Sequence, residues 1–210
     1  MADIAISILN VYSTVLMRIG GYSILFDPVG VIPHQFKNLN VIVVTHEHAD
    51  HFDKKLLVEL HKNTRAMILT TPFVAKQLTG LGDSISAMKP GDSFEVAKDV
   101  TIYAEKSEHS ANQALTFFIE TKMATVFHPN DSSYYPELAS LRDKYRPSIM
   151  IFVGNSMKEL LRISKVMKPG VIVTYNYPGI KPIKAPDTMV VTLKQFEWYY
   201  YPDKFRGAYN

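Results

Sequence analysis

Residues 41–51 read Val41-Ile42-Val43-Val44-Thr45-His46-Glu47-His48-Ala49-Asp50-His51. The first four residues are apolar and β-branched, which predicts a buried strand. His46 and His48 stand two residues apart at its end, so their side chains leave the backbone on the same side. Asp50 and His51 follow where the chain is expected to turn into a helix. Imidazole nitrogens and carboxylate oxygens are ligands of borderline divalent cations such as zinc. The stretch therefore predicts a metal site directly after a buried strand.

The pattern His46-x-His48-x-Asp50-His51 after an apolar strand resembles the signature of the metallo-β-lactamase fold superfamily. Five further segments resemble parts of these proteins in the same order, up to about residue 180. They are Ile24-Leu25-Phe26-Asp27-Pro28, Lys89-Pro90-Gly91-Asp92, Glu108-His109, Phe127-His128-Pro129-Asn130-Asp131 and Val171-Ile172-Val173-Thr174-Tyr175-Asn176-Tyr177. The short spacers and the run His51-Phe52-Asp53 are most similar to the ascorbate-phosphate lactonase-like branch of predicted metal-dependent hydrolases.

The pattern of apolar residues by itself predicts only a mixture of helices and strands. The resemblance implies an α+β fold, a four-layer αββα sandwich, with residues 1–210 as a single domain. Strands are expected at 4–9, 14–19, 22–26, 41–44, 66–69, 94–96, 100–104, 115–120, 124–127, 149–153 and 171–175. Helices are expected at 53–62, with Asp53 as N-cap, and at 71–79, 136–144 and 156–166. The aromatic segment 196–202 is expected to be an edge strand or a segment packed on the core.

The resemblance also implies a set of metal ligands. His46, His48 and His109 would hold one cation, and Asp50 and His51 would hold a second. Asp131 would bridge the two ions, and a bridging carboxylate offsets their mutual repulsion. By itself, His109 would be interpreted as an ordinary loop histidine, and Asp131 as part of an Asx turn or a helix cap.

The chain departs from the superfamily at Asn176, because the last metal-bearing strand usually ends in a histidine. An amide oxygen is a poorer ligand for zinc than an imidazole and suits harder ions such as manganese. We therefore expect one or two ions, with zinc first and manganese or iron as alternatives. His128 is a candidate catalytic residue, as a general acid or as a donor that orients a ligand. His34 and His61 are interpreted as an ordinary loop residue and a surface residue.

These ligands favour a hydrolase that attacks a small ester, lactone or phosphoester with a metal-bound hydroxide, with Asp50 orienting or deprotonating the water. One alternative is a degenerate relative that binds a metal or ligand without catalysis, because its second site is incomplete at Asn176. A redox role with iron is another, although diiron relatives usually have glutamate at the position of His48. The sequence contains no cysteine and no Gly-x-Ser-x-Gly motif, which excludes a thiol nucleophile and argues against that type of serine hydrolase.

Composition narrows the class of partner. The net charge of +3 is too small to indicate a nucleic-acid-binding protein. No apolar run approaches the about 20 residues of a membrane-spanning helix, and no signal peptide is visible. The absence of cysteine fits a reducing compartment, so we expect a cytoplasmic protein. We expect a small-molecule substrate as the partner, and no binding to nucleic acid or to a membrane. The sequence leaves open whether the chain forms a homo-oligomer.

Overall fold

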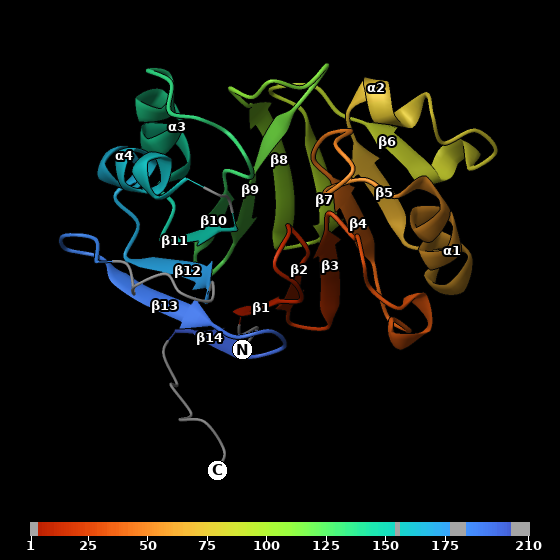
Figure 1. The fold of residues 1–210 in the computed structure, drawn as a ribbon, viewed down its shortest axis with the longest axis horizontal. Helices are drawn as coiled ribbons and strands as arrows, with labels where there is room; N and C mark the ends of the chain where they lie inside the picture. The colour runs from red at the N-terminus through yellow and green to blue at the C-terminus, as the bar shows by residue number, and fades with distance from the viewer. Residues whose placement is uncertain (1–3, 154–155, 177–183, 203–210) are drawn as a thin grey trace, which may run out of the picture.

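Two seven-stranded sheets pack face to face in the computed structural model, which describes residues 4–153, 156–176 and 184–202. Figure 1 shows the sheets in the middle, with α1 and α2 outside one of them and α3 and α4 outside the other. This is the αββα arrangement that the resemblance implied. None of the helices in the described ranges is long and apolar enough to cross a lipid bilayer.

The first sheet has the strand order β14-β1-β2-β3-β4-β5-β6. Its strands are β1 (Ile4–Ile8), β2 (Val15–Ile19), β3 (Tyr22–Phe26), β4 (Val41–Val44), β5 (Met67–Thr70), β6 (Ile85–Ala87) and β14 (Trp198–Tyr201). Strands β3 to β6 run parallel, whereas β14, β1, β2 and β3 alternate in direction. The end of β4 therefore lies beside the end of β3, and the loops after both strands share one edge.

The second sheet has the order β13-β12-β11-β10-β9-β8-β7. Its strands are β7 (Ser93–Ala97), β8 (Val100–Lys106), β9 (Leu115–Thr121), β10 (Thr125–His128), β11 (Ile149–Phe152), β12 (Val171–Tyr175) and β13 (Met189–Leu193). Strands β10 to β13 are parallel, and β7 to β10 are antiparallel. The ends of β8 and β10 consequently meet at the edge where β3 and β4 end.

Four helices cover the outer faces: α1 (Lys54–Thr64), α2 (Pro72–Ala75), α3 (Leu138–Tyr145) and α4 (Met157–Met167). Short 3-10 helices η1 (Pro33–Gln35) and η2 (Gly82–Ser84) lie in the connections. Asp53 is the N-cap of α1 as expected, since its carboxylate accepts from the N–H groups of Lys55 and Leu56. The helix expected at 71–79 is α-helical only to Ala75, and the chain continues in i→i+3 turns to Leu78.

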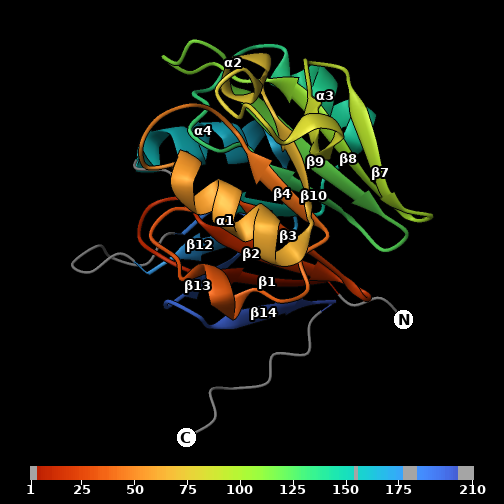
Figure 2. The same ribbon diagram turned by 90° about the vertical axis from the view of Figure 1, so that its right-hand side faces the viewer.

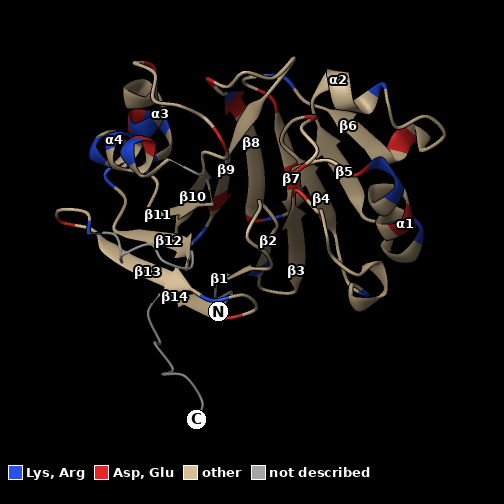
Figure 3. Cartoon of the chain, viewed as in Figure 1, with Lys and Arg blue, Asp and Glu red and all other residues tan. Residues whose placement is uncertain are grey.

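The apolar residues form three layers of core. The largest fills the space between the sheets, and its buried side chains include Ile6, Met17 and Phe117. Each outer face has its own layer, one under α1 and α2 and one under α3 and α4. Figure 2 shows α1 lying across the outer face of the first sheet, and Figure 3 shows the charged residues mainly on helices and connecting segments. The interior is otherwise apolar. Polar side chains that are buried at the edge where β3, β4, β8 and β10 end are therefore candidates for a functional site.

Candidate metal centre

The candidate centre begins where β4 ends. The chain continues through Thr45 and His46, whose side chains are buried. The backbone N–H groups of His51 and Phe52 then both donate to the carbonyl oxygen of His48, at 2.9 and 2.8 Å. This tight turn brings the second half of the stretch back towards its first half, so the short spacing in the sequence becomes a compact cluster.

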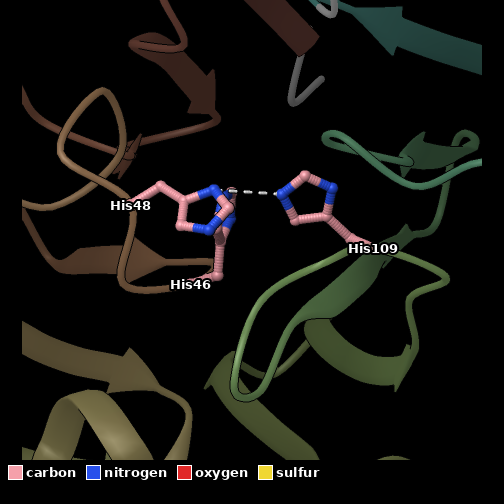
Figure 4. Close-up of side chains that lie close together, drawn as sticks. All are labelled: His46, His48 and His109. Atoms are coloured by element: carbon pink, nitrogen blue, oxygen red, sulfur yellow. Dashed lines mark hydrogen bonds between the residues drawn. The ribbon is translucent and has the colours of Figure 1, made fainter.

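Three imidazoles from the two sheets form the first group of candidate ligands. His46 and His48 follow β4, whereas His109 follows β8 and faces them from the other sheet (Figure 4). One ring nitrogen of each histidine lies within 4.8 Å of the other two, and His109 Nε2 is 3.2 Å from His48 Nδ1. Three inward-facing imidazoles with an open side are the donor set of a catalytic zinc site.

A second group shares His46 with the first. One donor atom each from His46, His51 and Asp131 also lies within 4.8 Å of the others. His51 Nε2 is 3.1 Å from Asp131 Oδ2 and 3.6 Å from Asp50 Oδ2. The side chain of Asp50 is 47% exposed, so it lies at the open side of the cluster, where water or a substrate can reach it.

His51 lies between carboxylates. Its Nδ1 is 3.0 Å from Asp27 Oδ2, and its Nε2 faces Asp131. Burial by itself would lower the pKa of His51, but the charge of Asp27 and the hydrogen bonds to Asp131 and Asp27 outweigh it and raise the pKa to about 10. A metal cation could therefore replace the proton on His51 Nε2, which faces Asp131.

The surroundings of His46 shift its pKa in the opposite direction from that of His51. Burial, followed by the positive charge of His51, lowers the pKa of His46 to about 4, so the ring is neutral at pH 7. Thr45 Oγ1 donates to Asp27 Oδ2 and lies 3.1 Å from His46 Nδ1, which is also 3.2 Å from the side-chain amide nitrogen of Asn130. His46 Nε2 is buried and has no hydrogen-bond partner among the described residues. A neutral imidazole with one nitrogen anchored and the other bare is the state that metal binding requires.

Asp27 is the important residue that the sequence-based site prediction missed. It directly follows β3, has a left-handed conformation with φ 44° and is fully buried. Its carboxylate accepts from the backbone N–H and the hydroxyl of Thr45, both at 2.8 Å, and faces His51. One carboxylate thus orients the residue before His46 and also His51. The signal in the sequence was a charged residue at the end of an apolar strand, in the quoted Asp27-Pro28 segment.

His128, a predicted catalytic residue, is fully buried at the end of β10. Its Nδ1 accepts from the backbone N–H of Asn130, whose side-chain amide nitrogen lies 3.2 Å from His46 Nδ1. Asn130 has φ 57°, a left-handed conformation that turns the chain from β10 towards Asp131. His128 therefore lies behind the cluster and reaches it through Asn130.

Replacing His128 with asparagine is expected to weaken the acid sensitivity of the fold. Burial lowers the pKa of His128 to about 3 from 6.5, so the unfolded chain binds a proton below pH 6.5 that the native chain does not bind. This contribution to stability is present above pH 6.5 and is lost as the pH falls towards 3. In His128→Asn, whose side-chain oxygen can still accept from Asn130, the slope of unfolding free energy against pH should fall by about 1.4 kcal/mol per unit in that range. Urea titrations at pH 4–7 would measure it, and an unchanged slope would contradict it.

The remaining polar candidates lie elsewhere on the fold. Asn176 follows β12, its side chain is exposed, and its backbone N–H donates to the carbonyl oxygen of Leu193 at 2.8 Å. Its role as a ligand stays a prediction. His34 is exposed in η1, as expected of a loop residue. The interpretation of His61 as a surface residue was wrong, because His61 is buried under α1 and its Nδ1 lies 2.9 Å from the carbonyl oxygen of Ala66.

Known proteins resemble this chain both in sequence and in fold. The chain is 24% identical over 195 residues to a UPF0173 metal-dependent hydrolase of Staphylothermus marinus, and the match covers 84% of each protein. Among solved structures, Igni18, described as a novel metallo hydrolase from Ignicoccus hospitalis, superposes with a TM-score of 0.78 at 19% identity and covers 96% of this chain and 100% of that one. The metallo-β-lactamase fold protein YhfI from Bacillus subtilis superposes with a TM-score of 0.72 at 17% identity, covering 95% and 100%.

A comparison of the sequence with models of protein families agrees with these similarities. The model of the β-lactamase superfamily domain matches residues 16–169. That range contains the strand end at Asp27, the turn from His46 to His51, His109 and Asp131, and thus both groups of candidate ligands. The chain belongs to the β-lactamase superfamily.

Proposed function

We propose that this protein is a metal-dependent hydrolase of small molecules. The observation that carries the proposal is the convergence of two overlapping donor groups, His46/His48/His109 and His46/His51/Asp131, at the edge where β3, β4, β8 and β10 end. Two of the similar proteins are named as a metal-dependent hydrolase and a metallo hydrolase, which supports the same reaction class. The first group, made of three imidazoles, suits zinc. The second, with carboxylate oxygens, also suits manganese or iron.

A divalent cation, when bound, lowers the pKa of coordinated water towards about 7 and so supplies a nucleophile at neutral pH. Asp50 is exposed beside the cluster and can accept the proton that the attacking water loses. In ester hydrolysis the water oxygen forms a bond to the acyl carbon, the bond from that carbon to the alcohol oxygen breaks, and the proton passes to the leaving oxygen. The products are a carboxylic acid and an alcohol.

His128 contributes by positioning rather than by proton transfer. Its ring has no exposed surface, and its lowered pKa leaves no extra proton to donate at neutral pH. It supports Asn130, which in turn contacts His46. His128 thus helps to fix the orientation of an imidazole that belongs to both donor groups.

Removal and return of metal test the proposal. We expect turnover of 4-nitrophenyl acetate, γ-butyrolactone or bis(4-nitrophenyl) phosphate to disappear after thorough chelation and to return on addition of zinc or manganese. Elemental analysis should find at least one ion per chain. Turnover that is unchanged after chelation would contradict a metal-dependent reaction. One bound ion without hydrolysis of any of the three substrates would favour the non-catalytic relative, which the neutral, exposed Asn176 makes the second candidate.

A further inference from the structure

Large apolar side chains project into solvent from two connections at the edge of the sandwich that holds the candidate metal centre. Val11 and Tyr12 lie in the loop between β1 and β2 and are 44% and 57% exposed. Phe196 lies in the turn between β13 and β14 and is 60% exposed. We call these three residues the apolar rim. Exposed apolar side chains in adjacent connections can together form a contact surface, although single exposed apolar residues are ordinary.

The loop that carries Val11 and Tyr12 is tied to the centre itself. The hydroxyl of Ser13 donates to the backbone carbonyl of Asp50 at 2.5 Å, and the hydroxyl of Thr14 donates to the backbone carbonyl of Asp27 at 2.7 Å. The Asn10 side chain oxygen accepts from the backbone N–H groups of residues 12, 13 and 14. The loop is thus fixed from within and joined to the residues that surround the donor groups.

Phe196 is joined to the base of the same loop. Its backbone N–H donates to the carbonyl oxygen of Ile8, and the Gln195 side chain donates to the carbonyl oxygen of Leu9 at 2.7 Å. Phe196 has φ 66°, a conformation that bulky residues rarely adopt. The fold therefore holds an aromatic ring in solvent at a position where glycine or asparagine would be the ordinary choice.

The charge around this loop indicates what the rim can bind. Residues 9–14 include no lysine, arginine, aspartate or glutamate. Phe196 is flanked by one charge of each sign, Lys194 and Glu197, and the carboxylate of Glu197 accepts from the backbone N–H of Lys194. On the other side of the donor groups, Lys106 is 3.1 Å from the carboxylate of Glu108 and lies over the ring of Tyr135. A phosphoester needs cations or N–H groups directed at its oxygens. An uncharged substrate with an apolar arm fits this side of the centre better.

We propose that the apolar rim binds the alkyl or aryl arm of an uncharged ester or lactone while its carbonyl group lies at the metal centre. This inference rests on the proposed function and selects one substrate class within it. Tyr12 is the central residue, because it adjoins Ser13, whose hydroxyl contacts Asp50, and because it offers more ring surface than Val11. The rim thus determines specificity and takes no part in the bond-breaking step.

A series of 4-nitrophenyl esters tests the rim by turnover. From acetate to hexanoate, kcat/KM of the zinc-loaded protein should rise by up to about fourfold per methylene, the limit for complete burial of each group. Tyr12→Ala should lower kcat/KM for the hexanoate about tenfold and that for the acetate less than twofold, whereas Tyr12→Phe should keep the preference. The matched control is Tyr22→Ala, which removes an exposed tyrosine at the opposite end of β3. Equal rates along the series, or a loss in Tyr22→Ala equal to that in Tyr12→Ala, would overturn the proposal.

Hydroxamate binding tests the apolar rim independently of catalysis. Acetohydroxamate and hexanohydroxamate carry the same metal-binding head, so the ratio of their Kd values for the zinc-loaded protein reports only the arm. We expect hexanohydroxamate to bind at least about tenfold more tightly, and Tyr12→Ala to remove most of the difference. A retained preference without turnover of the esters, γ-butyrolactone or bis(4-nitrophenyl) phosphate would refute the hydrolase proposal and leave the rim standing. Ester turnover with equal hydroxamate affinities would refute the rim and leave the hydrolase standing.

Discussion

Replacing His48 with alanine is expected to lower kcat/KM of the metal-loaded protein by more than about 100-fold and to reduce the bound metal. Residues that only orient a ligand typically change metal affinity or activity by about 10- to 100-fold, and His48 is placed to contribute a donor atom itself. Its Nδ1 lies 3.2 Å from His109 Nε2, so its loss leaves the first group with two imidazoles. Elemental analysis and steady-state kinetics on the same preparation measure both effects.

His34→Ala is the matched control for this variant. His34 is exposed in η1 and belongs to neither donor group, so its removal should leave metal content and turnover within about twofold of the parent protein. If His48→Ala retained full metal content and full activity, His48 would not be a ligand. The proposed centre would then have to be built without it.

Replacing Asp27 with asparagine should produce the largest loss of stability. The buried carboxylate receives two hydrogen bonds from Thr45 and faces His51 at 3.0 Å, and an amide would direct its own N–H group at one of these donors. Breaking such a buried pair costs about 3–5 kcal/mol. For a chain of this size the midpoint of thermal unfolding should fall by about 10 °C.

The metal affinity of Asp27→Asn should also fall, by about 10- to 100-fold, because Thr45 and His51 lose the group that orients them. Calorimetric unfolding of the metal-free protein and zinc titration separate the two effects. Asp83→Asn, which alters an exposed aspartate in η2, should change neither. A stable Asp27→Asn protein with unchanged zinc affinity would show that Asp27 is not required to position the centre.

The sequence predicted local features well where one strong physical signal determined them. The β-branched run before Thr45 formed β4, and Asp53 is the N-cap of α1 as predicted. The resemblance supplied the order of the layers, which periodicity could not. The grouping of His46, His48 and His109 required it as well, because 61 positions separate the last two residues and only the completed sandwich brings them together.

Features that depend on distant partners were harder to predict. No strand was predicted at the positions of β6 and β13, and a strand was one of two alternatives for β14. Such segments become strands only when a distant neighbour pairs with them, as β14 does with β1. His61 was misassigned although it lies four residues after the buried Leu57, which places it on the inner face of α1. Asp27 was quoted as part of a motif, but its contacts with Thr45 and His51 exist only once β3 and β4 are paired.

The donors come from both sheets, with His46 and His48 on one side and His109 and Asp131 on the other. A cation bound among them would join the two halves of the sandwich at their shared margin, and in a chain without cysteine no disulfide can do the same. Depleting the metal should therefore loosen this margin before the remote ends of the strands. Amide hydrogen exchange should show that order, with the residues around the donor groups exchanging first.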